Sequence, residues 1–367
     1  MTSLPALKIG QHTARYPIIQ GGMGIRISGA SLAAAVANAG GIGIISAIGL
    51  GLRSPYFDPL EPSPKKRHEN LLEANRLALI DELQKARKIS PHGIIGINAM
   101  VAAHGYETLV KTAAQHGADL IISGAGLPLP LPGLTAEFPS VALVPIVSSV
   151  RTARIICQKW QRQHDRLPDG IVVENPRSAG GHLGAKVDQL EDETLNASTV
   201  IPNLVSYLQQ DLKVDIPIVA AGGVWDHADI LQALALGASG VQIGTRFITT
   251  EECDADRRYK EFHLQAQPED VVLVSSPVGL PGRALRNPFV DKLLAQDAEI
   301  TQEPCLANCL KACQYRDRRE TYCILRALDQ ASQGEIESGL IFAGSNAGQA
   351  KRILPVAELM AELTLSS

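Results

Sequence analysis

The sequence has few aromatic residues and no long run of a single charge. Only 4% of its 367 residues are aromatic, which argues against a platform for stacking nucleic-acid bases. The formal net charge is −4 and no basic tract is present, so nucleic acid is not an expected partner. No apolar run reaches the roughly 18 residues of a membrane span, and the first residues lack a secretory pattern. We therefore expect a cytoplasmic protein without a membrane partner.

Several catalytic signatures are also missing. The sequence contains no phosphate-binding loop with its lysine, no H-E-x-x-H zinc helix and no G-x-S-x-G nucleophile elbow. Six cysteines in a chain of this length do not require disulfides in a reducing compartment. The composition, 45% hydrophobic and 20% charged, supports a large core, and the length suits one large domain with an appendage or two domains.

The stretch 216–245 holds the strongest local pattern. An apolar run at 218–221 is followed by Gly222 and Gly223, and Asp226 is a plausible N-cap for an amphipathic helix over 227–236. A second apolar run, 240–243, ends in Gly244 and Thr245. Side chains at these strand ends would keep an oxyanion from the backbone N–H groups, so the pair predicts a phosphate cradle. The alternative is that both glycine pairs are only turns.

The apolar runs recur along the chain and alternate with helical patterns. The predicted strands span residues 17–20, 43–46, 94–98, 120–123, 142–147, 170–174, 218–221 and 240–243. This number of βα units over about 245 residues predicts an α/β fold of the TIM (β/α)8-barrel type. An open doubly wound sheet is the alternative, but GGMGIRISG lacks the G-x-G-x-x-G spacing of such sheets.

After the predicted barrel comes an additional C-terminal segment. We assign 1–250 to the barrel and 251–367 to a loop and helical extension, with helices near 251–267, 291–298, 322–333 and 354–363. Residues 275–287 read as a Gly/Pro loop with two arginines. The proline-rich segment 50–66 is either a loop over the barrel mouth or a surface excursion.

Three polar residues at strand ends are candidates for chemistry. His182 lies in the glycine-rich loop 175–185, where an imidazole can approach a ligand closely and transfer a proton; otherwise it is a capping or exposed histidine. Asn98 can hydrogen-bond a polar ring edge, or it is a turn residue. Glu174 can hold a ribityl hydroxyl or orient His182, or it belongs to a structural ion pair.

A second group of candidates is the four cysteines with spacing C-x3-C-x3-C-x9-C: Cys305, Cys309, Cys313 and Cys323. On a helix, the first three would share one face. The spacing differs from those of common zinc and iron–sulfur sites, so packed thiols are the main interpretation, with a metal or cluster and a disulfide as alternatives. We assign no metal ligand.

Four motifs resemble the nitronate monooxygenase family, the FMN-dependent TIM-barrel flavoproteins once called 2-nitropropane dioxygenases. These motifs are QGGMG, AAAVANAGGIGIIS, AGGHLG and AAGGV…ALALGASGVQIGTRF. The resemblance covers 18–250 in order and extends through SPVGLPGR. The same superfamily includes NADH:quinone reductases and flavin-dependent enoyl-acyl-carrier-protein reductases.

The resemblance implies roles for individual residues. His182 matches the catalytic histidine, and the cofactor-binding residues it implies are Gly22, Met23, Gly24, Asn98, Gly181, Gly222, Gly223, Gln242, Gly244 and Thr245, to which we add Glu174. One departure is the run E-N-P-R-S-A-G-G-H, where well-defined nitronate enzymes have Q-G-x-E-A-G-G-H. This departure concerns the substrate more than the cofactor.

The resemblance implies an FMN-dependent oxidoreductase that converts alkyl nitronates with O2 into a carbonyl compound and nitrite. Its expected partners are an alkyl nitronate or nitroalkane and O2, and we expect a monomer or homodimer. The alternative is an NAD(P)H-dependent flavin reductase of quinones or enoyl thioesters, with Arg283 and Arg286 serving nucleotide phosphates. Two non-redox alternatives are a phosphosugar enzyme and a binding-only protein.

Overall fold

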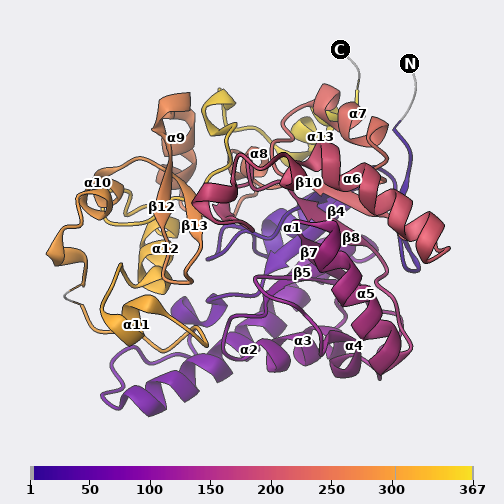
Figure 1. Ribbon diagram of the computed structural model, residues 1–367. Helices are drawn as coiled ribbons and strands as arrows, with labels where there is room; N and C mark the ends of the chain where they lie inside the picture. The colour runs from indigo at the N-terminus through magenta and orange to yellow at the C-terminus, as the bar shows by residue number, and fades with distance from the viewer. Residues whose placement is uncertain (1–3, 302, 366–367) are drawn as a thin grey trace.

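The centre of the protein is a closed barrel of eight parallel strands (Figure 1). The structure is a computed structural model that describes residues 4–301 and 303–365. In chain order the barrel strands are β3 (Ile18–Gln20), β4 (Ile42–Ser46), β5 (Ile94–Met100), β6 (Leu120–Gly124), β7 (Ala142–Val147), β8 (Ile171–Glu174), β10 (Ile218–Ala221) and β11 (Gly240–Ile243). The barrel closes through the pairing of β8 with β10 and of β11 with β3. The TIM-barrel prediction is therefore confirmed, and the open sheet is not formed.

Apolar side chains of the strands pack both inside the barrel and against the helices outside it. Ile19, Ile44 and Val144 belong to a buried cluster inside the barrel, and that cluster also takes in Leu7 and Ile9. These last two come from a hairpin, β1 (Leu7–Ile9) and β2 (His12–Ala14), which seals the end where the strands begin. Parallel strands buried on both faces read as continuous apolar runs, which is why the sequence showed them clearly.

The helices form an outer layer. They are α1 (Ala30–Asn38), α2 (Pro64–Ile89), α3 (Tyr106–Gln115), α4 (Leu131–Leu134), α5 (Val150–His164), α6 (Ala197–Ser206), α7 (His227–Ala235) and α8 (Thr245–Ile248). Asp226 caps α7 as predicted, because its side chain accepts a hydrogen bond from the Asp229 N–H at 3.0 Å. Among the described helices, none combines the length and apolar character that a membrane crossing needs.

Most of the segment after residue 250 adds helices and a small sheet on one side of the barrel, drawn in orange in Figure 1, and its last part, drawn in yellow, returns to the barrel. Its elements are α9 (Arg257–Gln265), β12 (Val271–Ser275), β13 (Pro281–Leu285), α10 (Pro288–Leu294), α11 (Gln314–Arg318), α12 (Ile324–Ser332) and α13 (Val356–Thr364). The predicted loop at 275–287 is wrong in its second half, because β13 pairs there with β12 and with the short β9 (Gly181–His182). The helix predicted at 251–267 begins only at Arg257.

The last helix returns to the barrel wall. α13 contacts α1 and α7, and its apolar side chains Val356, Leu359 and Leu363 are buried. It thus covers the barrel next to the short α8, where an eighth barrel helix is expected. The division of the chain at residue 250 stays a prediction.

The proline-rich segment 50–66 packs against the extension. Leu52 and Phe57 share a buried cluster with Leu310 and Tyr315, and none of the described residues of this segment lines the cavity at the barrel mouth. The prediction of a loop over the mouth is therefore wrong.

Candidate active site

A large cavity opens where the barrel strands end. Its volume is about 640 Å³, and its walls come from the strand ends and from the extension. All the predicted site residues line it: Gly22, Met23, Gly24, Asn98, Glu174, Gly181, His182, Gly222, Gly223, Gln242, Gly244 and Thr245. The structure thus brings them together, and their individual roles stay predictions.

Two glycines without side chains directly follow β10. Gly222 and Gly223 have φ of +88° and +83°, the left-handed region that favours glycine. A Cβ on Gly222 would lie 2.9 Å from the Asn175 carbonyl oxygen and 3.0 Å from the Ala179 nitrogen. Among the described residues, the N–H groups of Gly222, Gly223 and Gly244 donate to no protein acceptor. This corner can therefore give several hydrogen bonds to an oxyanion.

The extension completes this corner. The Thr245 hydroxyl accepts a hydrogen bond from the Gly344 N–H at 2.8 Å, and the Asn346 side-chain amide donates to the Gly223 carbonyl at 2.8 Å. The sequence did not predict a role for residues 344–346. The Gly-Ser-Asn run is a turn signal, and nothing in it shows that the turn lies against Gly223.

The segment after β3, which contains Gly22 and Met23, also lines the cavity mainly with backbone. A Cβ on Gly22 would lie 2.3 Å from the Cβ of Asn98, so only glycine lets β5 and the QGGMG segment approach this closely. Met23 is fixed by its own N–H, which donates to the Ser28 hydroxyl at 2.8 Å. A flat ligand can therefore lie against this segment with few side chains in its way.

Two buried polar atoms in the cavity wall lack protein partners. The side-chain oxygen of Gln242 and the hydroxyl of Ser178 are both buried and, within the described residues, form no hydrogen bond. Leaving a buried polar atom unpaired costs free energy, so the Gln242 oxygen and the Ser178 hydroxyl are candidate partners for a polar ligand in this cavity.

Glu174 is a third polar group without a partner. No described residue forms an ion pair or a hydrogen bond with its carboxyl group, so the alternative of a structural ion pair does not hold. Burial raises the pKa of Glu174 from 4.5 to about 7, because protein encloses the carboxyl and little water solvates its charge. Near neutral pH this group can donate or accept a hydrogen bond.

His182 lies on β9, which is held to β13 of the extension. Its Nε2 lies 2.7 Å from the Ser276 hydroxyl, and its ring meets the edge of Phe342 at 5.1 Å between centroids. Burial lowers the pKa of His182 from 6.5 to about 4, so the imidazole is neutral at physiological pH. In that form one ring nitrogen can accept a proton, and the alternative of an exposed histidine does not hold.

Ser276 is a residue that sequence reasoning missed. It is only 2% exposed and sits between His182 and the buried Tyr322. Burial raises the pKa of Tyr322 and the nearby Ser276 lowers it in part, yet the Tyr322 hydroxyl completes no hydrogen bond with a described residue. The Ser276 hydroxyl contacts the His182 ring and also accepts a hydrogen bond from the Val278 N–H at 3.4 Å.

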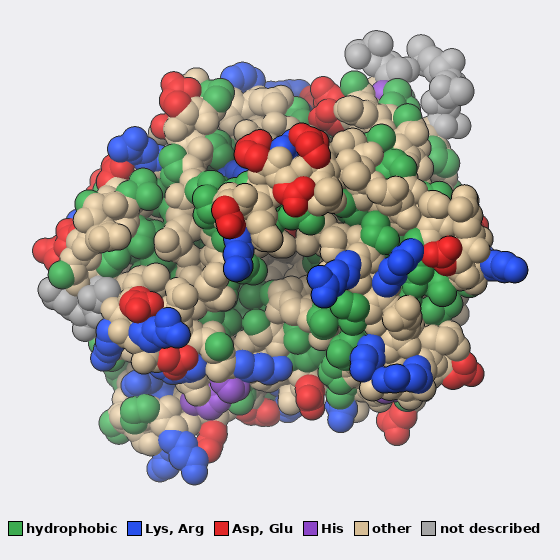
Figure 2. Space-filling view, viewed as in Figure 1, with side chains coloured by type: hydrophobic (Ala, Val, Ile, Leu, Met, Phe, Trp, Pro, Cys, Tyr) green, Lys and Arg blue, Asp and Glu red, His purple; other side chains and the backbone are tan. Residues whose placement is uncertain are grey.

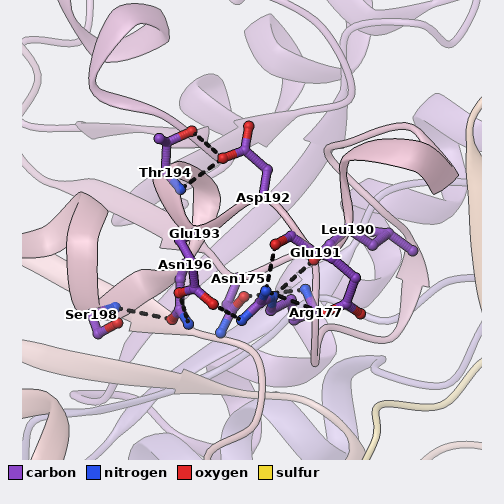
Figure 3. Close-up of polar contacts among 9 residues, drawn as sticks. All are labelled: Asn175, Arg177, Leu190, Glu191, Asp192, Glu193, Thr194, Asn196 and Ser198. Atoms are coloured by element: carbon purple, nitrogen blue, oxygen red, sulfur yellow. Dashed lines mark hydrogen bonds and ion pairs between the residues drawn. The ribbon is translucent and has the colours of Figure 1, made fainter.

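The loop after β8 is organised by Arg177 (Figure 3). Its guanidinium donates to the carbonyls of Leu190 and Glu191 at 2.8 and 2.7 Å and pairs with Glu193 at 2.9 Å. The arginine in the unusual E-N-P-R-S run is thus occupied with holding its own loop.

The two arginines suggested for nucleotide phosphates have other partners. Arg283 is buried in β13 and donates to the carbonyls of Ala179 and Pro176, and Arg286 pairs with Asp291 at 2.7 Å. The suggestion that they serve a nucleotide is therefore not supported. Figure 2 shows charges of both signs spread over the face in view, without a basic stripe.

A parallel barrel with one glycine-lined cavity at its strand ends, holding a neutral histidine, has the architecture of a (β/α)8-barrel enzyme. Comparisons with known proteins place it more narrowly. A sequence profile of the nitronate monooxygenase family matches residues 6–366. The chain is 27% identical to a probable nitronate monooxygenase of Staphylococcus saprophyticus, covering 82% of this chain and 85% of that protein. Identity to the Staphylococcus haemolyticus counterpart is 26%, with coverage of 79% and 80%.

Solved structures share this fold. FabK from Thermotoga maritima has a TM-score of 0.69 at 25% identity and covers 95% of this chain and 92% of its own. A nitroalkane oxidase from Streptomyces ansochromogenes shares the fold, with a TM-score of 0.67 at 19% identity over 95% of each chain. The chain belongs to the nitronate monooxygenase family, and it is an oxidoreductase.

Proposed function

We propose that this protein is an FMN-dependent enzyme that oxidises alkyl nitronates with O2 to a carbonyl compound and nitrite. One observation carries the proposal. The backbone N–H groups of Gly222 and Gly223, which donate to no described residue, line the same cavity as the neutral imidazole of His182. Membership of the nitronate monooxygenase family supports the reaction class.

The residues present fit FMN. Gly222, Gly223, Gly244 and Thr245 would hold its phosphate, because their backbone N–H groups donate to no described residue and three of the four lack a side chain. The unpaired oxygen of Gln242 and the Asn98 amide would meet the polar edges of the ring. When bound, the flavin would accept the electrons of the substrate and pass them on to O2.

Glu174 and Ser178 are the remaining polar groups without partners in the wall. Both would hydrogen-bond the hydroxyls of the ribityl chain, since this chain has to run between the phosphate corner and the ring. A Glu174 that keeps its proton about half of the time near pH 7 can do so at a lower cost of burying charge than an ordinary carboxylate.

His182 would take a proton from a neutral nitroalkane. If Nε2 carries the hydrogen and donates it to the Ser276 hydroxyl, Nδ1 is left as the proton acceptor. No described residue is bonded to Nδ1, so substrate can reach it. A nitronate, which has already lost this proton, needs only a hydrogen-bond donor at the same place.

The test is nitrite release from the FMN-loaded protein in air, with propionate 3-nitronate and with 2-nitropropane. We expect His182→Ala to lower kcat/KM for 2-nitropropane by at least about a hundredfold, as expected for loss of a general base, and for the nitronate by less. The exposed His92 provides the matched control, and His92→Ala should change neither. If the FMN-loaded wild type releases no nitrite from propionate 3-nitronate and none from 2-nitropropane, this function is excluded.

The second candidate is an NAD(P)H-dependent flavin reductase of quinones or enoyl thioesters. The observation that favours it is the likeness to FabK over 95% of the chain. Rapid anaerobic bleaching of the bound flavin by NADH or NADPH, together with no nitrite from nitronates, would replace our first proposal with this one.

A further inference from the structure

The cavity beside His182 has an apolar side that the proposed reaction leaves unexplained. Six side chains that line the cavity also belong to one hydrophobic cluster, and we call them the apolar wall: Val278, Leu310, Ile324, Leu325, Leu328 and Phe342. All six come from the extension, and three of them lie on α12. The extension therefore supplies the active-site cavity with a clustered hydrophobic surface.

The apolar wall begins at His182. The Phe342 ring meets the imidazole at 5.1 Å between ring centroids. The Val278 N–H donates to the Ser276 hydroxyl at 3.4 Å, and the same hydroxyl lies 2.7 Å from His182 Nε2. A substrate whose reacting carbon lies beside His182 therefore has apolar side chains next to the rest of its chain.

The far end of the apolar wall lies across the barrel mouth from the phosphate corner. Leu310 forms a bridge with Ala103, shortly after β5, and the Lys311 N–H donates to the Ala102 carbonyl at 2.9 Å. In the closed barrel, β5 stands four strands from β10 in either direction, so these two strands are opposite each other. Leu310 is thus on the side of the cavity opposite the glycines proposed to hold the phosphate.

The loop that carries Leu310 also carries three cysteines. The helix on which Cys305, Cys309 and Cys313 would share one face is not formed, because no helix is described between 303 and 313. Instead, their side chains pack into the same hydrophobic cluster as the apolar wall. Cys309 also lines the cavity, and burial raises the pKa of its thiol, so it adds no charge there.

The apolar wall offers no partner to a negative charge. No lysine, arginine or aspartate is among the described residues that line the cavity, and His182 is neutral. Two arginines close to the wall in the fold have other partners. Arg53 pairs with Asp329 of α12 at 2.7 Å, and Arg316 pairs with Asp317 at 2.7 Å. Burying an unpaired carboxylate against such a surface costs far more free energy than burying methyl groups.

We propose that the apolar wall binds the uncharged hydrocarbon part of the substrate, so the enzyme prefers nitronates with an apolar chain to nitronates that carry a second negative charge. The nitronate group lies beside His182, and its chain contacts Leu310 and Leu328. The statement about nitronates rests on the proposed function, whereas the ligand preference of the wall does not. Propionate 3-nitronate, with its carboxylate, is therefore expected to be a poor substrate.

The first test compares two unreactive anions of equal size, 4-methylpentanoate and succinate. Two methyl groups of the first replace the two oxygens of one carboxylate in the second, and the carboxylate that they share stands in for the nitronate group. Their binding to the FMN-loaded full chain is followed through the absorption spectrum of the flavin. We expect 4-methylpentanoate to bind at least about thirtyfold more tightly.

The variant Leu328→Lys places an ammonium group in the wall at a partly exposed position. It should strengthen succinate binding at least about tenfold and weaken 4-methylpentanoate binding at least about threefold. The control is Leu294→Lys, the same change at a 50% exposed leucine of α10 outside the cavity, which should alter neither. A second variant, Leu328→Ala, should weaken 4-methylpentanoate binding about fivefold and leave succinate unchanged, so the test does not depend on the folding of Leu328→Lys.

The second test is nitrite release in air from propionate 3-nitronate and from the nitronate of 3-methyl-1-nitrobutane, which differ in the same way. We expect kcat/KM to be at least about thirtyfold higher for the second. The inference is overturned if the wild type binds succinate as tightly as 4-methylpentanoate, if it prefers propionate 3-nitronate, or if both lysine variants give the same affinities. The expected binding preference without nitrite from either nitronate contradicts the proposed function instead and supports the ligand preference of the wall.

Discussion

Single residues in this cavity are tuned by burial more than by charged neighbours. Enclosure lowers the pKa of His182 and raises that of Glu174, so at physiological pH the imidazole is neutral and the carboxyl is close to the midpoint of its titration. Opposite shifts in one cavity are typical of sites that move protons.

Ser276 should position His182. We expect Ser276→Ala to lower kcat/KM for 2-nitropropane about tenfold, because one hydrogen bond near 1.4 kcal/mol would be lost. The effect on a preformed nitronate should be smaller, since no proton is then abstracted. Ser275→Ala, a change at the exposed neighbour, is the control and should have no effect. An equal loss with both substrates would instead assign Ser276 a purely structural role.

Glu174 should make the stability of the flavin-free protein depend on pH. Its folded-state pKa of about 7 lies above the ordinary 4.5, so the folded state keeps the proton to higher pH than the unfolded chain does. The contribution of this carboxyl to stability should therefore fall as pH rises from about 4.5 through about 7, by on the order of 2 kcal/mol. The lowered pKa values of His182 and His263 change stability in the opposite direction over part of this range, so the loss is measured as a difference. The free energy of unfolding of the wild type minus that of Glu174→Gln, from denaturant unfolding at several pH values, should fall as pH rises.

A matched change at the exposed Glu137 controls for surface charge. If Glu137→Gln and Glu174→Gln give the same pH profile, the carboxyl of Glu174 is not the group that titrates.

At the scale of elements, the extension and the barrel depend on each other. β13 holds the strand that carries His182, and α13 covers the barrel between α1 and α7. Removing either contact therefore affects a part of the molecule that is distant in sequence.

The packing of α13 can be tested with one matched pair. Leu359 is fully buried and Leu365 is 65% exposed, on the same helix or directly after it. We expect Leu359→Ala to lower the free energy of unfolding by about 2–4 kcal/mol, since it leaves a cavity, and Leu365→Ala by less than about 0.5 kcal/mol. Equal small effects would mean that α13 adds little to the barrel.

The sequence was sufficient for the barrel and for most of the cavity. All barrel strands except β5 are apolar runs that end in, or are directly followed by, a small or polar residue, so both the strand and its functional end are visible locally. β9 is only two residues long, and it forms because β13 arrives from far along the chain. Ser276 and Asn346 join the site through such long-range contacts, for which the sequence carries no local pattern.

At the scale of the whole molecule, one cavity brings together the residues proposed to bind the cofactor and the histidine proposed to transfer a proton. The ends of β10 and β11 supply backbone donors, and the loop after β8 supplies His182, with the extension closing both. The central claim is that the backbone corner holds the phosphate of FMN.

The measurement that tests this claim most directly is a comparison of FMN and riboflavin binding to the flavin-free protein, by fluorescence titration. The two ligands differ only in the phosphate. We expect FMN to bind at least about a hundredfold more tightly, which is what two charge-assisted hydrogen bonds provide. Gly222→Ala should remove that preference, since its Cβ would meet the Asn175 carbonyl. Equal affinities for FMN and riboflavin in the wild type would contradict the account.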